Sequence, residues 1–335
     1  MSYVCVPIFG HELRASLGTD GRAEAVAPEC SNEHNAVMNR ALAGIFCALA
    51  LTCLSPALCS SEPIARIAIT TVRDRVMVPV RLNGSNGLSF MLDTGFSMTM
   101  IHPELAEPLK LRRVGEITVE GIAGEEKAPT YEGAVFEIGS ARFEPRRVAA
   151  LASDGSRRRR RDGILGSGVF RQFVVEIDTA GKQLSLHAPG EFTYSGKGEI
   201  VPLRFRRGGT TPIITAIIHG TNDAPIRGEF EIDTGCDSGI CLGHDFIQAS
   251  HLLEERETRA GAKFGVGGGT TTRNGHLPLI QIGAAKVERP DTDFFLEGSP
   301  VDRGLAGHIG MGVLKHFKII FDYSRRQMIL EPLAR

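Results

Sequence analysis

The chain has 335 residues, with 38 basic and 39 acidic side chains and a formal net charge of −1 at pH 7. A balance this close to neutral gives no electrostatic reason to expect nucleic acid or an anionic membrane as the partner. The 39 glycines and the short, β-branched apolar runs favour a protein built mainly from strands.

Residues 1–59 are predicted to precede the folded part of the chain. Residues 1–37 are polar and lack periodicity, and we interpret them as a non-native, disordered upstream extension. Residues 38–59 have a basic start, an apolar run and a small-residue end, which is typical of a secretory signal peptide. The apolar run is short for a membrane span, although an uncleaved anchor is the alternative. We therefore expect an exported protein, periplasmic or secreted, with no stable membrane span after cleavage.

A tripeptide occurs twice, each time at the end of an apolar run: Asp93-Thr94-Gly95 and Asp233-Thr234-Gly235. The expected structure at both sites is a strand that runs into a tight glycine turn. The two aspartates lie 140 positions apart, and several later segments recur at a constant offset of 144 positions. The matching segments are residues 121–124 and 265–268, 138–139 and 282–283, and 164–170 and 308–314. This constant offset indicates a duplicated lobe.

The rest of the sequence predicts an all-β fold with two lobes. Short apolar runs, such as residues 174–177 and 318–321, alternate with glycine-rich and asparagine-rich turns. That pattern is typical of closed or sandwiched sheets. Turn-forming residues accumulate between the end of one repeat and the start of the next. We therefore place an N-terminal lobe at residues 66–188, a linker at 189–198 and a C-terminal lobe at 199–333.

Two aspartates that a pseudo-twofold axis brings together can perform acid–base chemistry. Because like charges at close range raise one pKa, the pair holds one proton between its two carboxyl groups. The ionised carboxylate can draw a proton from water while the protonated one donates to a carbonyl oxygen, so peptide hydrolysis needs no covalent intermediate. Gly95 and Gly235 allow the turns and present N–H groups, and the Thr94 and Thr234 hydroxyls can tie the loops together.

The paired Asp-Thr-Gly motifs, the glycine loops and the apolar-apolar-Gly segments resemble the aspartic peptidases of the pepsin and retropepsin kind. Residues 162–166, Asp-Gly-Ile-Leu-Gly, look like the pepsin-type segment, and residues 233–237, Asp-Thr-Gly-Cys-Asp, are closer to the retroviral form. The resemblance implies two homologous acid-protease-type β-barrel lobes related by pseudo-twofold symmetry, with the active-site cleft between them. It also implies an aspartic endopeptidase in which Asp93 and Asp233 are the catalytic pair.

By the same resemblance, the two glycine loops are flaps that close over an extended peptide or protein substrate. The flap residues are Gly121, Ile122, Ala123, Gly124, Gly265, Val266, Gly267 and Gly268. Because one chain carries both halves of the site, we expect a monomer. The alternative is a catalytically silent relative that binds an extended peptide by strand addition without cutting it.

The sequence departs from the family pattern near both aspartates. His308 stands where an apolar residue is expected. Phe96 and Cys236 occupy the position three residues after each aspartate, where pepsin-like sites have a hydroxyl. Without that hydrogen-bond donor the pKa values of the pair should be higher, which predicts an activity optimum in the mildly acidic range.

Cysteine and histidine form no closely spaced ligand cluster, so we expect neither a metal site nor a cofactor. Beyond residue 59 the cysteines are Cys236 and Cys241, which flank a short strand. Two residues at that spacing on a strand are generally too distant for a disulfide and point to opposite faces. We therefore expect free thiols.

Five consecutive arginines occupy positions 157–161. Like charges in a row repel one another and must be solvated, which predicts a surface loop. A docking patch for an acidic partner is the alternative.

Overall fold

The computed structural model of the chain describes residues 62–151, 161–206, 208–220, 223–297 and 304–333. The predicted upstream extension (1–37), the signal peptide (38–59) and the first four of the consecutive arginines (157–160) lie outside the described residues. Within the described part, no helix is both long and apolar enough to cross a membrane.

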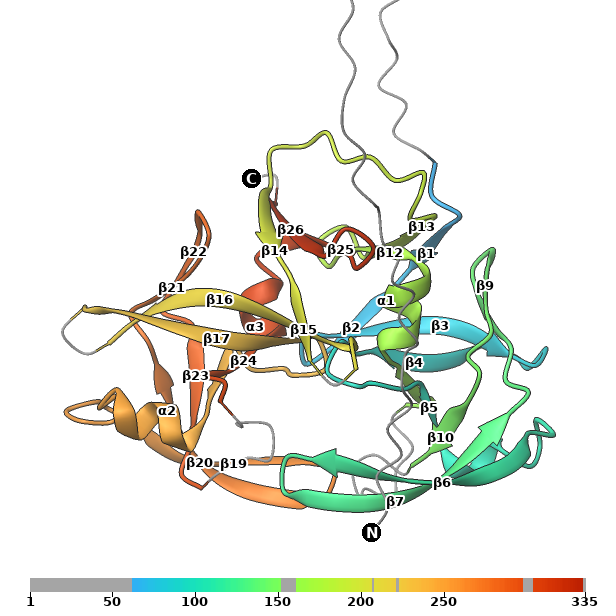
Figure 1. Ribbon diagram of the computed structural model, residues 1–335, viewed down its shortest axis with the longest axis horizontal. Helices are drawn as coiled ribbons and strands as arrows, with labels where there is room; N and C mark the ends of the chain where they lie inside the picture. The colour runs from blue at the N-terminus through green and yellow to red at the C-terminus, as the bar shows by residue number, and fades with distance from the viewer. Residues whose placement is uncertain (1–61, 152–160, 207, 221–222, 298–303, 334–335) are drawn as a thin grey trace, which may run out of the picture. The chain divides into compact units, whose positions relative to one another are not determined.

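The first repeat forms a ten-stranded sheet, drawn mainly in cyan and green in Figure 1. In spatial order its strands are β6 (Arg112–Gly121), β7 (Gly124–Glu132), β10 (Val148–Ala150), β5 (Met100–Ile101), β11 (Gly163–Leu165), β4 (Leu88–Leu92), β3 (Arg75–Leu82), β8 (Phe136–Ile138) and β9 (Ala141–Phe143). The tenth strand, β2 (Thr70–Val72), pairs with β3 beside this path.

The second repeat forms another ten-stranded sheet. Its strands, in spatial order, are β19 (Arg259–Gly265), β20 (Gly268–His276), β23 (Asp291–Phe295), β18 (Ile240–Leu242), β24 (Gly307–Gly310), β17 (Pro225–Asp233), β16 (Thr211–His219), β21 (Leu279–Ile282) and β22 (Ala285–Glu288), with β15 (Arg204–Arg206) beside β16. Strand by strand this is the order of the first sheet, with β17 in the place of β4 and β24 in the place of β11. The predicted all-β fold with two homologous lobes is confirmed.

A third sheet of six strands contains strands from both repeats. Its order is β1 (Ala65–Ala68), β13 (Gln183–His187), β12 (Val174–Asp178), β25 (Phe317–Asp322), β26 (Gln327–Pro332) and β14 (Glu199–Pro202). Strands β12 and β25 pair in antiparallel fashion, with Glu176 opposite Ile320. Backbone hydrogen bonds therefore cross from one repeat to the other, and the described residues all belong to one compact unit.

The few helices are short, and two of them follow the apolar-apolar-Gly segments. The helices are α1 (Ser167–Gln172) after β11, α3 (Met311–Leu314) after β24, α2 (His244–Ala249), and the 3-10 helix η1 (Pro103–Leu105). Phe170 of α1 meets Phe321 of β25 edge to face, with ring centroids 5.2 Å apart, and stacks on Tyr323 at 5.6 Å. This aromatic cluster packs the six-stranded sheet against the first lobe.

The segment between β13 and β14 contains no strand. Phe192 and Tyr194 pack with apolar side chains of β12, β25 and β26, and the Tyr194 hydroxyl accepts a hydrogen bond of 2.6 Å from the Gly198 N–H. The segment predicted as a linker, 189–198, is therefore fastened to the six-stranded sheet. The predicted boundaries of the two lobes stay a prediction.

Truncation of Phe321 should test this core. Phe321→Ala should lower the free energy of unfolding by about 3–5 kcal/mol, because the fully buried ring leaves a cavity against Phe170. Phe264→Ala is the matched control, because it removes the same atoms from a side chain that is 78% exposed. Its free energy of unfolding should change by about 0.5 kcal/mol or less. Urea denaturation followed by circular dichroism measures both, and equal losses of stability would contradict the packing described above.

Candidate active site

The two Asp-Thr-Gly loops face each other. Asp93 follows β4 and Asp233 ends β17, and each of these strands pairs in parallel with the strand of an apolar-apolar-Gly segment, β11 or β24. Asp93 is only 3% exposed, and the Asp233 side chain is 19% exposed. The two carboxyl groups share a hydrogen bond. The structure thus brings together the two aspartates that the repeat singled out.

Glycine follows each Asp-Thr pair because there is no room for a larger residue. A Cβ atom at Gly95 would lie 3.0 Å from Oδ1 of Asp233, and a Cβ at Gly235 would overlap the carboxyl group of Asp93. Each glycine N–H also donates to the aspartate of its own loop, Gly95 to Asp93 at 2.8 Å and Gly235 to Asp233 at 2.9 Å. The two glycines therefore permit the close approach and orient the carboxyl groups.

The threonines lock the two loops to each other. The Thr94 hydroxyl donates to the Ile232 carbonyl at 2.6 Å and accepts from the Thr234 N–H at 3.0 Å. The Thr234 hydroxyl does the same in the opposite direction, donating to the Leu92 carbonyl at 2.9 Å and accepting from the Thr94 N–H at 3.0 Å. Both threonines are fully buried, so these hydrogen bonds fix the distance between the loops.

The predicted flap residues lie at the tips of two hairpins, β6–β7 and β19–β20, which meet along one edge of the molecule in Figure 1. The Ala123 N–H donates to the Val266 carbonyl at 3.3 Å, and a Cβ at Gly265 would lie 2.9 Å from the Ile122 side chain. Gly121, Ile122, Gly265 and Val266 line the cavity that contains the aspartates. Ala123, Gly124, Gly267 and Gly268 lie at the tips but not in its lining.

The cavity between the flaps and the aspartates has a volume of about 220 Å³ and is lined by both lobes. Arg161, the last of the five arginines, lines it, and its charge lowers the pKa of Asp93. Arg161 also lies 3.3 Å from the Met91 sulfur. Sequence reasoning treated this arginine as part of a surface loop, because nothing in the local pattern shows that the chain turns into the cleft there.

His308 is a second residue of the candidate site that sequence reasoning missed. Its Nδ1 lies 3.6 Å from Oδ2 of Asp233, and its side chain is 16% exposed. The sequence signal was a histidine at a position where the first repeat has Ile164. From the sequence we interpreted this difference as one that affects packing alone. In the structure the imidazole points toward Asp233.

The environments of the two carboxyl groups push their pKa values in opposite directions. Burial and the charge of Asp233 raise the pKa of Asp93 well above its ordinary value, against the lowering effect of the Gly95 N–H. Burial also raises the pKa of Asp233, but the contact with His308, the bond to Asp93 and the Gly235 N–H outweigh it, so this pKa is lowered. Between these two values the pair holds a single proton.

Cys236 and Cys241 are closer than the sequence suggested, with their sulfurs 3.4 Å apart. The prediction that they lie far apart on opposite faces was wrong, because Cys236 belongs to the turn after β17 and not to β18. Both are free thiols in the structure. Their contact lowers the pKa of Cys236 and raises that of Cys241. The Cys236 thiol therefore interacts with its neighbouring thiol, while the Cys236 backbone N–H donates to the Asp233 carbonyl at 3.2 Å.

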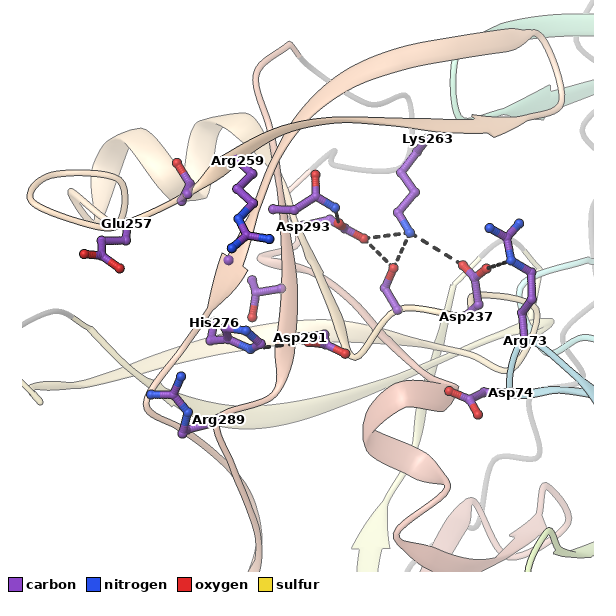
Figure 2. A pocket seen from close by; sticks show the side chains of 15 residues that line it. Arg73, Asp74, Asp237, Glu257, Arg259, Lys263, His276, Arg289, Asp291 and Asp293 are labelled. Atoms are coloured by element: carbon purple, nitrogen blue, oxygen red, sulfur yellow. Dashed lines mark hydrogen bonds and ion pairs between the residues drawn. The ribbon is translucent and has the colours of Figure 1, made fainter.

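A larger open groove of about 810 Å³ lies beside the cavity, and Figure 2 shows the charged side chains that line it. Neither Asp93 nor Asp233 lines this groove, so its larger volume does not identify it as the candidate active site. Lys263 of β19 points from the flap hairpin to Asp293 at 2.8 Å and to Asp237 at 3.5 Å (Figure 2). Asp237 also binds Arg75 of the first lobe at 2.8 Å. The ion pairs of Lys263 fasten the second flap to the body of its lobe, and the Arg75–Asp237 ion pair connects the two lobes. Among the described residues, no group of three or more metal-ligating side chains is placed to hold a metal ion.

Comparison with known proteins agrees with this geometry. Residues 78–169 match a family described as aspartyl protease. The resemblance to the aspartic peptidases is thereby confirmed. The chain is also similar to the crystal structure of an aspartic proteinase from Irpex lacteus, with 15% sequence identity, a TM-score of 0.54, and coverage of 80% of this chain and 97% of that one. Among curated proteins there is no match. The structural likeness shows that the described chain has the aspartic peptidase fold.

The threonine lock of this aspartic peptidase fold can be tested by removing one hydroxyl. Thr234→Val should lower the free energy of unfolding by about 2–4 kcal/mol, because the Thr94 N–H and the Leu92 carbonyl lose their partner in a buried site. Thr234→Ser keeps the hydroxyl and should recover most of the loss. Chemical denaturation of both variants provides the measurement. A valine variant as stable as the wild type would show that the lock contributes nothing.

Proposed function

We propose that the protein is an aspartic endopeptidase that hydrolyses peptide bonds with a water molecule activated between Asp93 and Asp233. The observation that carries the proposal is the pair itself: a buried Asp93 and a partly buried Asp233 whose carboxyl groups share a hydrogen bond beneath two flap hairpins. The aspartyl protease family match and the fold support hydrolysis of this type. The predicted signal peptide at 38–59 gives the proposed setting, the periplasm or the cell exterior.

Peptide hydrolysis needs one acid and one base, and a pair with a single proton supplies both. The ionised carboxylate accepts a proton from water, whose oxygen attacks the carbonyl carbon of the peptide bond. The protonated carboxyl donates to the carbonyl oxygen, so the tetrahedral intermediate forms without charge on that oxygen. The carboxyl group that took the proton from water then gives it to the amide nitrogen, and the C–N bond breaks. The other carboxylate takes a proton back from a hydroxyl of the intermediate as the product carboxyl group forms, so the pair returns to its starting single-proton state.

The shape of the site fits an extended polypeptide. The flap tips touch each other across the cavity, so the hairpins must separate to admit a polypeptide and can close over it afterwards. Both lobes contribute apolar and charged side chains to the wall, among them Phe96 and Arg161 from the first lobe and Phe295 and His308 from the second. The proposed substrate is therefore a peptide that meets apolar and charged groups on both sides of the cleft.

Isosteric replacement of either aspartate provides the direct test. Asp93→Asn and Asp233→Asn should each abolish cleavage of a diverse peptide mixture measured by mass spectrometry, because a pair with one carboxyl group cannot supply both acid and base. Retention of more than a few per cent of the wild-type activity by either variant would overturn the assignment.

Asp223→Asn is the matched control for these variants. This aspartate is exposed in the turn between β16 and β17, and its φ of 55° suits asparagine equally well. It should cleave peptides like the wild type. Binding of peptides by the wild-type protein without any cleavage would favour the silent, peptide-binding alternative.

The proposed site is complete within one chain, since each lobe supplies one aspartate and one flap. Specific activity should therefore be independent of protein concentration over a dilution series from micromolar to nanomolar. Light scattering at the same concentrations provides the molecular mass. A steep fall in specific activity together with a dimeric mass would show that a second chain is required.

A further inference from the structure

The two lobes differ at three positions that lie side by side in neighbouring strands. In the first lobe Ile164 of β11 is opposite Met91 of β4 and Met100 of β5. In the second lobe His308 of β24 is opposite Glu231 of β17 and Cys241 of β18. The strands correspond one to one in the two sheets. An apolar trio on one side of the cleft is thus replaced by an ionisable trio on the other.

The fold itself does not require a histidine at position 308. At the corresponding place in the first lobe, Ile164 is 1% exposed and packs with Met91 and Met100. The same strand arrangement therefore forms behind Asp93 with an apolar residue. Even a partly buried imidazole costs free energy unless a charge or a hydrogen bond compensates for its desolvation, so its presence beside only one of the two aspartates calls for a role other than packing.

Two carboxyl groups and two thiols surround His308. Asp233 and Glu231 face it from β17, Cys241 faces it from β18, and Cys236 from the turn after β17. Asp93 lies beyond Asp233, and the cations Arg161 and Lys263 line the same cavity. Glu231 is 3% exposed, so water screens its charge weakly. This environment favours the protonated, cationic imidazole.

We infer that His308 is a positioning residue of the proposed peptidase: its imidazolium holds Asp233 in the ionised form and so leaves the single proton of the pair on Asp93. The assignment rests on the function proposed above. Asp233 then accepts the proton of the attacking water, and Asp93 donates its proton to the carbonyl oxygen of the substrate. When the C–N bond breaks, Asp233 gives its proton to the amine and Asp93 takes one back from the hydroxyl of the intermediate. Proton and charge balance, and the pair returns to its starting state.

His308 is protonated over the pH range in which such a site works. Burial lowers the pKa of the imidazole, but the contact with Asp233 and the charge of Glu231 outweigh it and raise the pKa to about 9. The pKa of Asp233 is lowered by the same contact. The ion pair is lost as pH falls through the lowered pKa of Asp233, and it is lost again as pH rises through about 9.

Replacement of His308 by the residue of the other lobe gives the test by activity. In His308→Ile the acidic limb of the pH profile of kcat/KM, which Asp233 sets, should move to higher pH by about 1–2 units, because a nearby cation no longer favours the ionised carboxylate. The alkaline limb, which Asp93 sets, should move less, because His308 contacts Asp233 and not Asp93. His308→Gln keeps a polar side chain without a charge and should behave like the isoleucine variant. A profile that stays in place in the isoleucine variant, or one that the glutamine variant restores, would overturn the role of the charge.

Two measurements that need no peptidase activity keep this test separate from the proposed function. The His308 ring should titrate near pH 9 in NMR spectra of the full chain, and in Asp233→Asn its pKa should fall by more than about one unit. An ordinary histidine pKa in the wild type, or no change in the variant, contradicts the inference.

A small epoxide reports which aspartate is ionised. The carboxylate oxygen attacks an epoxide carbon and forms an ester, and the opened oxygen takes a proton from the partner carboxyl or from water. Mass spectrometry of the digested protein should find the ester on Asp233 in the wild type, and a loss of that preference by at least about tenfold in His308→Ile. Labelling mainly on Asp93 in the wild type would overturn the inference. If peptides are not cleaved but Asp233 is labelled, the proposed function fails while the ion pair stands.

Discussion

The close approach of two carboxyl groups is the constraint on which the whole site depends, because like charges at this distance oppose it. Hydrogen bonds between the two Asp-Thr-Gly loops hold them together. The hydroxyls of Thr94 and Thr234 each bond across to the opposite loop and strand, and the glycines that follow leave room for the facing carboxyl group. The six-stranded sheet adds a second, independent connection, since β12 and β25 pair across the repeats. A buried hydrogen bond is costly to leave unmade, so this arrangement resists separation of the loops.

Much of the fold could be predicted because the sequence contains the same pattern of segments twice. A constant offset between segments indicated two lobes, and the two ten-stranded sheets do have the same strand order. The shared sheet could not be predicted in the same way. The apolar runs at 174–177 and 318–321 identify strands, but strand pairing is decided by backbone edges that meet only after both lobes have formed. The residue pattern of a strand does not identify the strand with which it pairs.

Within the site, the residues that belong to the repeat were foreseen and those that break it were not. Asp93 and Asp233 stand out because each copy supports the other. His308, Arg161 and the Cys236–Cys241 contact have no counterpart in the other lobe. His308 replaces an apolar residue within strand β24, whereas Arg161 and Cys236 lie outside strands, where a turn directs the chain. Spacing along a strand placed the two thiols on opposite faces, yet one of them lies in a turn to which strand geometry does not apply. Side-chain direction outside regular structure is the information that the sequence pattern lacks.

These residues also change the argument about proton sharing. The missing hydroxyls at Phe96 and Cys236 predicted that both pKa values of the pair would rise together. The structure instead separates them: burial and the charge of Asp233 raise the pKa of Asp93, whereas the contact with His308 helps to lower that of Asp233. The pH range in which the pair holds one proton extends from the lower of these values to the higher. A cation on one side only therefore widens that range, whereas a change common to both carboxyl groups would merely displace it. A duplicated fold supplies two equivalent carboxyl groups, and a local break in its symmetry is enough to make one of them the acid and the other the base.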